Sequence, residues 1–595
     1  MQKSNLNKSP LFFNPEDLIA LKNQFQTSLF TADRHWLKRD LEILEKQELP
    51  PTTFSWWCVN LPDAMLAGQF QAAQESLLTA WHLLEYKNAP QLARNLLISQ
   101  ANLPTWLDKE YGLEIGHDLS SSHHCRGLSA GLETAKGILT VEEIQKIYTS
   151  YTQKVRLPYL NASFEGNDYL TGYRNTNWLS HLSGSVLISE IAWAKYGLED
   201  RATIALAKAN VLRYVDCIRP DGSLPEIGDY FHYGMEFALL SLHAWSLHYK
   251  KNLIEKYAQS GLSKAIHFCM AFTDKNGEFW ADFGDTHIGK HEASRVVGYL
   301  YAYRLQSECG QWLGDLPATR EPIAALLRPI NVNAKFTPPS SANFAGEEMI
   351  VFNENKHSLA FRGGACRSKK FNIPHRHYDS GSLIYRINNI NVLSDSGHDM
   401  YTDTFWKNYD DPKHEKSAPH FHNIILINDR GHQKEDETNG KIIVWNDRQA
   451  EYKYFIWQLT SSFPNLKLWE RQVLLLENTN LIVIDRLIAD GAKNIKVLWH
   501  YHDLPTIHSM NVLSTNILAG KFYANCQFKV SIDKTHPKPC SVIDINIKET
   551  DQNPKIIVSS FADKNDKPLS INFDQNESLI KINNKQWNIK DYYFK

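Results

Sequence analysis

Apolar residues recur every three to four positions through the first 330 residues of the chain. The segments 71–86, 183–197, 201–218 and 234–250 show this spacing most clearly, and it predicts helices that bury one face. Short breaks rich in Gly, Pro and Asp separate them. Many helices of similar length with short connections indicate helical hairpins, arranged either as a solenoid or as an α/α toroid. No strict repeat favours a particular solenoid family.

The pattern changes after residue 330. Residues 331–345 are polar and rich in Pro and Ser, which is typical of a linker. Beyond them apolar and polar residues alternate, as in SLIYRINNINVLSD around an Asn388-Asn389 turn, and this period predicts strands and hairpins through to residue 595. We therefore expect a multidomain α + β protein, with an α/α toroid at 1–330, an incomplete barrel of helical hairpins, and an antiparallel β-sandwich at 346–595.

Composition and charge exclude several functional classes. The formal charge is −2, so the chain has no basic field to attract nucleic acid or a membrane surface. The first apolar run is only LFF, too short for a signal peptide. We therefore expect a cytoplasmic location, or a periplasmic or secreted one if a leader was removed. The 8 cysteines are scattered without a CxxC pair, which indicates buried thiols.

The strand-rich half contains the densest group of polar residues. His375, His377 and Asp379 stand two positions apart, and Asp395 and His422 follow. Residues two apart on a strand share a face, and imidazoles with a carboxylate suit zinc. The alternative for one HxH is a solvated strand edge. The additional residues Asp395 and His422 favour a functional site over this alternative.

The helical half has its candidates at two helix starts. Asn177 and His181 are spaced i and i+4 and share a helix face, although Asn175 or Asn177 could instead be a helix N-cap. The segment 221–237 presents Glu226, Tyr230 and Tyr233 at a loop-to-helix junction; packing is the alternative for the tyrosines. Two other histidine groups are interpreted as structural: DLSSSHHCRG at 118–127, expected to be a loop, and the HxH at 500–502.

These motifs together resemble the heparinase II/III-like polysaccharide lyases. The resemblance rests on HRHYDSGSLIYRINNINVLSDSG, on the later HFHNIILIND, and on Asn177 followed some 55 residues later by a tyrosine. It covers most of the chain and implies a toroid followed by a sandwich. One departure is Trp178, where some relatives have a histidine.

The resemblance implies β-elimination at a uronic acid. Asn177 would neutralise the uronate carboxylate, and Tyr233 and His375 would share the acid and base roles, with Tyr230 as the alternative tyrosine. A zinc ion of structural function would be held by His377, Asp395 and His422, just behind His375, with Asp379 as support. No organic cofactor is expected. Independently of the resemblance, the candidate substrate contacts are Arg174, His181, Glu226 and Arg376.

The expected partner is an anionic, uronate-containing glycan, with neither nucleic acid nor a membrane involved; a homodimer stays open. Two rival functions remain. A glycoside hydrolase would need two opposed carboxylates, for which Glu226 and Asp229 are the candidates. A non-catalytic glycan-binding or assembly protein would need no acid or base.

Overall fold

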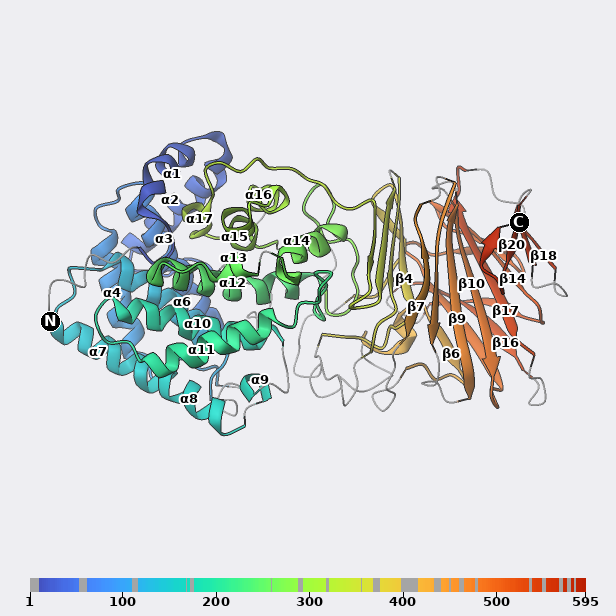
Figure 1. Ribbon diagram of the computed structural model, residues 1–595, viewed down its shortest axis with the longest axis horizontal. Coiled ribbons are helices and arrows are strands. Elements are labelled where there is room, and N and C mark those ends of the chain that lie inside the picture. The colour runs from blue at the N-terminus through green and yellow to red at the C-terminus, as the bar shows by residue number, and fades with distance from the viewer. Residues whose placement is uncertain are drawn as a thin grey trace.

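The computed structural model describes most of the chain. The described residues are 10–52, 61–109, 116–166, 168–171, 176–257, 259–286, 293–316, 320–354, 356–366, 375–397, 416–432, 440–448, 451–459, 465–476, 480–534, 538–547, 553–566, 571–574, 579–582 and 585–594. They form a helical domain followed by a strand domain, and the two lie at opposite ends of the long axis in Figure 1. This order confirms the fold class predicted from the sequence.

The helical domain is built from helices that pair along the chain. They are α1 (Leu18–Phe25), α2 (Thr31–Glu45), α3 (Pro62–Leu83), α4 (Ala89–Asn102), α6 (Leu119–Thr134), α7 (Val141–Tyr151), α8 (Leu157–Phe164), α9 (Asp168–Thr171), α10 (Asn177–Ala194), α11 (Arg201–Val215), α12 (Asp229–Tyr249), α13 (Leu253–Lys256), α14 (Gly261–Ala271), α15 (Arg295–Leu305), α16 (Glu308–Gly314) and α17 (Ala324–Leu327). Helices α3, α6, α10 and α12 are almost fully buried, including their polar residues, and they form the centre of the helical domain. No described helix is long and apolar enough to cross a membrane.

The strand domain consists of antiparallel sheets. One sheet has the order β1 (Ser341–Phe344), β2 (Met349–Glu354), β3 (His357–Arg362), β4 (Ser382–Ile387), β5 (Ile390–Leu393). A second has the order β12 (Thr506–Ser509), β13 (Val512–Ser514), β14 (Leu518–Ala524), β17 (Lys555–Asp563), β10 (Asn480–Ala489), β9 (Leu466–Leu476), β8 (Tyr452–Leu459), β7 (Lys441–Asn446). Two smaller sheets are β15 (Lys529–Asp533), β16 (Cys540–Asn546), β11 (Asn494–His500), β6 (Ile425–Ile427), and β18 (Ile571–Asp574), β19 (Leu579–Ile582), β20 (Lys585–Asn588), β21 (Tyr593–Phe594).

The sheet of β1–β5 lies between the helices and the rest of the sandwich. Its alternate residues belong to different cores: Met349 and Val351 pack with the helical core, whereas Ile350 and Phe352 pack with the sandwich core. Both faces of this sheet are therefore buried, and the sheet joins the two domains into one structure. Side chains that point from it toward the helices can meet side chains of the helical domain.

The turn between β4 and β5 and the segment that joins the two domains were both anticipated in the sequence. The turn between β4 and β5 is at Asn388 and Asn389, whose φ angles of 49° and 68° are those of a type I′ hairpin. Helix α17 ends at Leu327 and strand β1 begins at Ser341, inside the segment 331–345 that the sequence predicts to be a linker.

Candidate functional site

Asn177 is the first residue of α10, and its partner is a carboxylate from another part of the chain. The backbone N–H of Asn177 donates to Glu226 Oε2 at 2.7 Å, and its side-chain Nδ2 donates to Glu226 Oε1 at 2.8 Å. The N-cap position belongs to Thr176, which makes no side-chain capping bond. Glu226 thus takes over the capping of α10, where a negative charge is favoured by the helix dipole. The N-cap alternative for Asn177 is wrong.

Close packing of α10 against α12 brings Asn177 beside Tyr233. A Cβ atom on Gly234 would lie 3.1 Å from Asn177 Cβ, and one on Gly184 would lie 2.7 Å from the carbonyl oxygen of Phe237. Glycine at 184 therefore lets α10 and α12 approach, whereas glycine at 234 makes room chiefly for the hydroxyl of Tyr214 on α11, which would lie 2.1 Å from a Cβ atom there. Ser180 Oγ also donates to the carbonyl of Gly234 at 2.5 Å.

The hydroxyl of Tyr233 meets a buried histidine of α6. His123 Nε2 lies 3.3 Å from Tyr233 Oη, and His123 Nδ1 lies 2.6 Å from Gln71 Oε1. The amide oxygen of Gln71 can only accept, so Nδ1 carries the hydrogen and Nε2 accepts from the tyrosine hydroxyl. Burial lowers the pKa of His123 to about 3, which keeps the ring neutral in this role.

His375 approaches the helical domain from the strand domain. Its ring stacks on Tyr230, with centroids 3.5 Å apart and planes at 14°. Its Nδ1 lies 2.9 Å from Asp285 Oδ2, and its Nε2 lies 3.8 Å from Glu226 Oε1. Burial raises the pKa of the Glu226 carboxyl, and His375 and the two bonds from Asn177 oppose that rise. Residues from both domains thus meet at one point.

This group of side chains is almost enclosed. Asn177, Glu226, Tyr230 and Tyr233 are 1%, 3%, 4% and 6% exposed, and the His375 side chain is 8% exposed. In such surroundings hydrogen bonds and charges act more strongly than in water. These residues offer an amide, two phenols, an imidazole and a carboxyl, all of them buried, which are groups suited to proton transfer.

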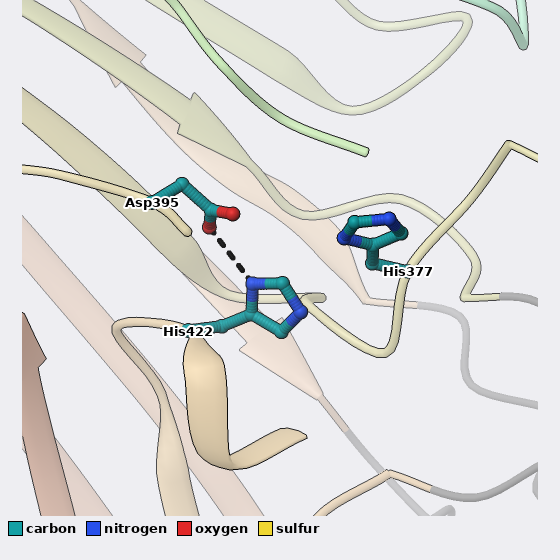
Figure 2. A group of neighbouring side chains, drawn as sticks. All are labelled: His377, Asp395 and His422. Carbon is teal, nitrogen blue, oxygen red and sulfur yellow. Dashed lines mark hydrogen bonds and ion pairs between the residues drawn. The ribbon is translucent and has the colours of Figure 1, made fainter. Parts of the chain in front are cut away.

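His377, Asp395 and His422 form a second group of neighbouring side chains (Figure 2). One possible ligand atom from each residue lies within 4.8 Å of the others, and all three residues are buried. His422 Nδ1 lies 2.9 Å from Asp395 Oδ2, and the rings of His377 and His422 are 5.3 Å apart between centroids. The sequence-predicted metal ligands are therefore neighbours in space.

The chemistry of this group fits a divalent metal ion. His377 Nε2 lies 2.7 Å from Asp285 Oδ1, but its buried Nδ1 has no hydrogen-bond partner among the described residues. Burial lowers the pKa of His377 and keeps the ring neutral. Burial would raise the pKa of Asp395, yet His422, His377 and Lys538 hold it below its usual value. A neutral imidazole and a charged carboxylate are the forms that bind zinc.

Several predicted positions differ from what the sequence suggested. Residues 375–381 are not a strand but an irregular segment before β4, so the shared strand face is absent. His375 and His377 nevertheless meet, because both contact Asp285. Asp379 is paired with Arg362, and among the described residues it belongs to no metal-binding group, in keeping with a supporting role.

The predicted substrate contacts are mostly buried. His181 is fully buried behind Tyr233, with ring centroids 3.7 Å apart, and its Nε2 lies 2.9 Å from the carbonyl oxygen of Tyr233. Arg376 is 6% exposed and pairs with Glu347. The surroundings of His181 and Arg376 indicate structural support for the site. Arg174 lies outside the described residues.

Two residues of the site were not predicted. Segment 118–127 is not a loop: Asp118 caps α6 through a capping box with Ser121, a signal that was present in the sequence. His123 therefore lies on a buried helix. Asp285 follows Gly284 in a tight turn, but nothing in the sequence alone links it to histidines some 90 residues later. The HxH at 500–502 is structural, because His500 is buried whereas the His502 side chain is 57% exposed.

Comparison with known proteins agrees with this architecture. Residues 337–565 match the family model described as heparinase II/III-like, C-terminal, which confirms the resemblance found in the motifs. No curated protein matches the chain.

Solved structures resemble the whole chain. Heparinase III has 15% identity and a TM-score of 0.63, over 88% of this chain and 82% of that one. Heparan sulfate lyase HepC from Pedobacter heparinus has 13% identity and a TM-score of 0.61, over 99% and 92%. Chondroitin AC lyase of Streptomyces coelicolor A3, solved in complex with chondroitin sulphate, has 12% identity and a TM-score of 0.53, over 95% and 87%. The chain therefore has the toroid-plus-sandwich fold of these lyases.

Proposed function

We propose that this chain, whose residues 337–565 match the heparinase II/III-like, C-terminal family model, is a polysaccharide lyase that cleaves a uronate-containing glycan by β-elimination. The observation that carries the proposal is that Glu226 of the helical domain contacts both Asn177 and, from the strand domain, His375. Tyr233 lies three residues along α12 from Tyr230, which stacks on His375. The fold shared with heparinase III and chondroitin AC lyase supports the same reaction class. The partner we propose is an anionic glycan.

The first chemical step removes the C5 proton of the uronate. A base takes this proton, and the electron pair it leaves is delocalised into the neighbouring carboxylate. That carboxylate gains negative charge, so donors placed at it lower the barrier. Asn177 supplies such an amide donor.

The second step breaks the C4–O4 bond. The electron pair forms a C4=C5 double bond, and the departing O4 takes a proton from an acid. Tyr233 and His375 are the two groups that can fill the base and acid roles. Tyr233 Oη is held by neutral His123, and His375 presents Nε2 toward Glu226. The products together have the mass of the substrate, because no water is added.

Tyr230 has a different role from Tyr233. Its ring face lies on His375, so it fixes the imidazole plane. Tyr233 presents its hydroxyl to the neutral ring of His123, which can accept its proton. We therefore assign proton transfer to Tyr233 and the positioning of His375 to Tyr230.

We also propose a structural zinc ion at His377, Asp395 and His422. The geometry of these residues and the unpartnered Nδ1 of His377 support it. A bound ion there supplies a cross-link between the segments before β4, after β5 and before β6. His375 is two residues from His377, so this cross-link would hold the segment that positions the acid/base histidine. No organic cofactor is needed for the elimination.

The experiment that tests the function is a survey of uronate-containing polymers and oligomers. Lyase products carry an unsaturated uronate that absorbs in the ultraviolet. Formation of this chromophore from at least one glycan, lost on replacing Tyr233 by Phe, is the expected result. Product masses increased by one water would instead indicate a hydrolase.

A further inference from the structure

Asp285 lies between the acid/base histidine and the metal-binding group. Its Oδ2 is 2.9 Å from His375 Nδ1, and its Oδ1 is 2.7 Å from His377 Nε2. The side chain of Asp285 is fully buried. One carboxylate therefore contacts two histidines with different tasks, each through a separate oxygen.

A carboxylate accepts hydrogen bonds, so the ring nitrogen that faces it carries the hydrogen. On His375 this places the hydrogen on Nδ1 and leaves Nε2 toward Glu226, where a proton can be accepted. On His377 it places the hydrogen on Nε2 and leaves the lone pair of Nδ1 for a metal ion. The unpartnered Nδ1 of His377 is the atom that this arrangement frees. Each histidine is thus held in the ring form that its task requires.

The turn that carries Asp285 is built to fit against His375. Gly284 has φ of 63°, and a Cβ atom there would lie 2.4 Å from the carbonyl oxygen of His375. The backbone N–H of Asp285 donates to that same carbonyl at 3.3 Å, and Thr286 Oγ1 closes the turn on the carbonyl of Phe283 at 2.8 Å. Asp285 belongs to the helical domain, between α14 and α15, whereas both histidines belong to the strand domain. The contact is therefore made only when the domains are docked.

We propose that Asp285 is a positioning residue that sets the ring form of His375 and His377 together, and thereby couples the acid/base histidine to the metal-binding group across the domain junction. The part concerning His375 rests on the proposed lyase function. The part concerning His377 does not rest on it, because zinc affinity tests that part without any lyase assay. Asp285 itself is neither a metal ligand nor a group that touches the glycan.

The test replaces Asp285 by Asn, which has nearly the same shape but offers one acceptor and one donor. An amide cannot accept from both rings, so one histidine must change its ring form or turn away. The expected results for D285N are zinc affinity reduced 10- to 100-fold in chelator competition and kcat reduced 10- to 100-fold with KM within about threefold of the wild type. A crystal structure of D285N should show the His375 or the His377 ring displaced from its place against Tyr230 or His422.

Asp274→Asn is the matched control. Asp274 also joins the two domains, through a pair with Arg386 at 3.0 Å, but it touches neither histidine among its described contacts. D274N should keep zinc affinity and kcat within about threefold of the wild type. Gly284→Ala is a second variant, which keeps the carboxylate but forces the turn away from His375; it should lose zinc affinity and kcat as D285N does.

The proposal is overturned if D285N folds with both rings in place and keeps zinc affinity and kcat within threefold of the wild type. It is also overturned if D274N loses as much as D285N, because domain docking would then explain both. A wild-type chain that binds zinc but cleaves no glycan would refute the lyase function alone. The zinc affinities and ring positions of D285N would still decide the role of Asp285.

Discussion

Asn177 and Glu226 are joined by two hydrogen bonds, at 2.7 Å from the backbone N–H and 2.8 Å from the side-chain amide. The amide expected to meet the uronate carboxylate is thus already engaged by a buried carboxyl. A glycan carboxylate that enters here meets Glu226 as well as Asn177. Glu226 should therefore weaken glycan binding, because it repels the uronate, but assist catalysis, because it holds Asn177 in place. Measuring KM and kcat separates the two effects.

Replacing Glu226 by Gln should lower KM and kcat together. Removal of a partly charged group that repels the uronate is expected to lower KM about fivefold, or ~1 kcal/mol. The Gln side chain offers one oxygen where the carboxylate offers two, so Asn177 loses one anchoring bond and kcat falls about fivefold. Steady-state kinetics measures both constants. An increase in KM would show that Glu226 assists glycan binding.

Tyr233 and Tyr230 should respond differently to the loss of a hydroxyl. Tyr233→Phe removes the group that transfers a proton, and kcat should fall at least about 100-fold. Tyr230→Phe keeps the ring that stacks on His375 at 3.5 Å, so kcat should stay within about threefold. Kinetics of both variants, with thermal unfolding as a check on folding, decides the assignment. The reverse order of effects would make Tyr230 the catalytic tyrosine.

The metal proposal predicts a stabilisation that depends on three residues. Zinc at 100 times its Kd should stabilise the wild type by about 2.7 kcal/mol through mass action, seen as a higher Tm. His377→Ala and Asp395→Asn should bind no stoichiometric zinc and show no shift. His500→Gln, which replaces a buried histidine outside the group, is the control and should keep the shift. Equal zinc binding by H377A would remove His377 from the ligand set.

The buried histidines of α6 predict a loss of stability in acid. Burial lowers the pKa of His124 to about 3, so the folded chain keeps this ring neutral while the unfolded chain takes up a proton below its ordinary pKa near 6.5. The contribution is therefore complete above about pH 6.5 and is lost as the pH falls toward 3. From pH 7 to 5 it amounts to about 2 kcal/mol of unfolding free energy.

His124→Gln should reduce the pH dependence by this amount. Denaturant unfolding at pH 7 and pH 5 gives the unfolding free energy at each pH. The difference between the two values is compared, so stability that the substitution itself removes at both pH values cancels. His502→Gln changes a histidine whose side chain is 57% exposed and should keep the wild-type difference. A wild-type pH dependence in H124Q would show that other groups account for the loss in acid.

The fold was predictable because each half of the chain has one clear period. The helical spacing at 183–197 and 234–250 became α10 and α12, and the Asn388-Asn389 turn became the β4–β5 hairpin. The segment 118–127 was mistaken because its Ser and His run hides the apolar period, although Asp118 and Ser121 form a capping box. A helix that is buried on all sides can carry polar residues on any face, so a search for one apolar face does not detect it.

The site was predictable only where residues are close in sequence or follow a motif. Glu226 contacts both Asn177 and His375, and His377, Asp395 and His422 are neighbours in space. Asp285 could not be found, since its importance lies in a contact between domains. The predicted roles of His181 and Arg376 were inferred from residue type, while burial decides where those side chains can point.

The central claim is that this site performs β-elimination, and mass spectrometry of the products tests it most directly. The wild type should convert a uronate-containing oligosaccharide into fragments whose masses sum to that of the substrate, one of them carrying an ultraviolet-absorbing unsaturated uronate. H375A and Y233F should form neither fragment at a comparable rate. Fragments that together carry one additional water, or full product formation by both variants, would contradict the account.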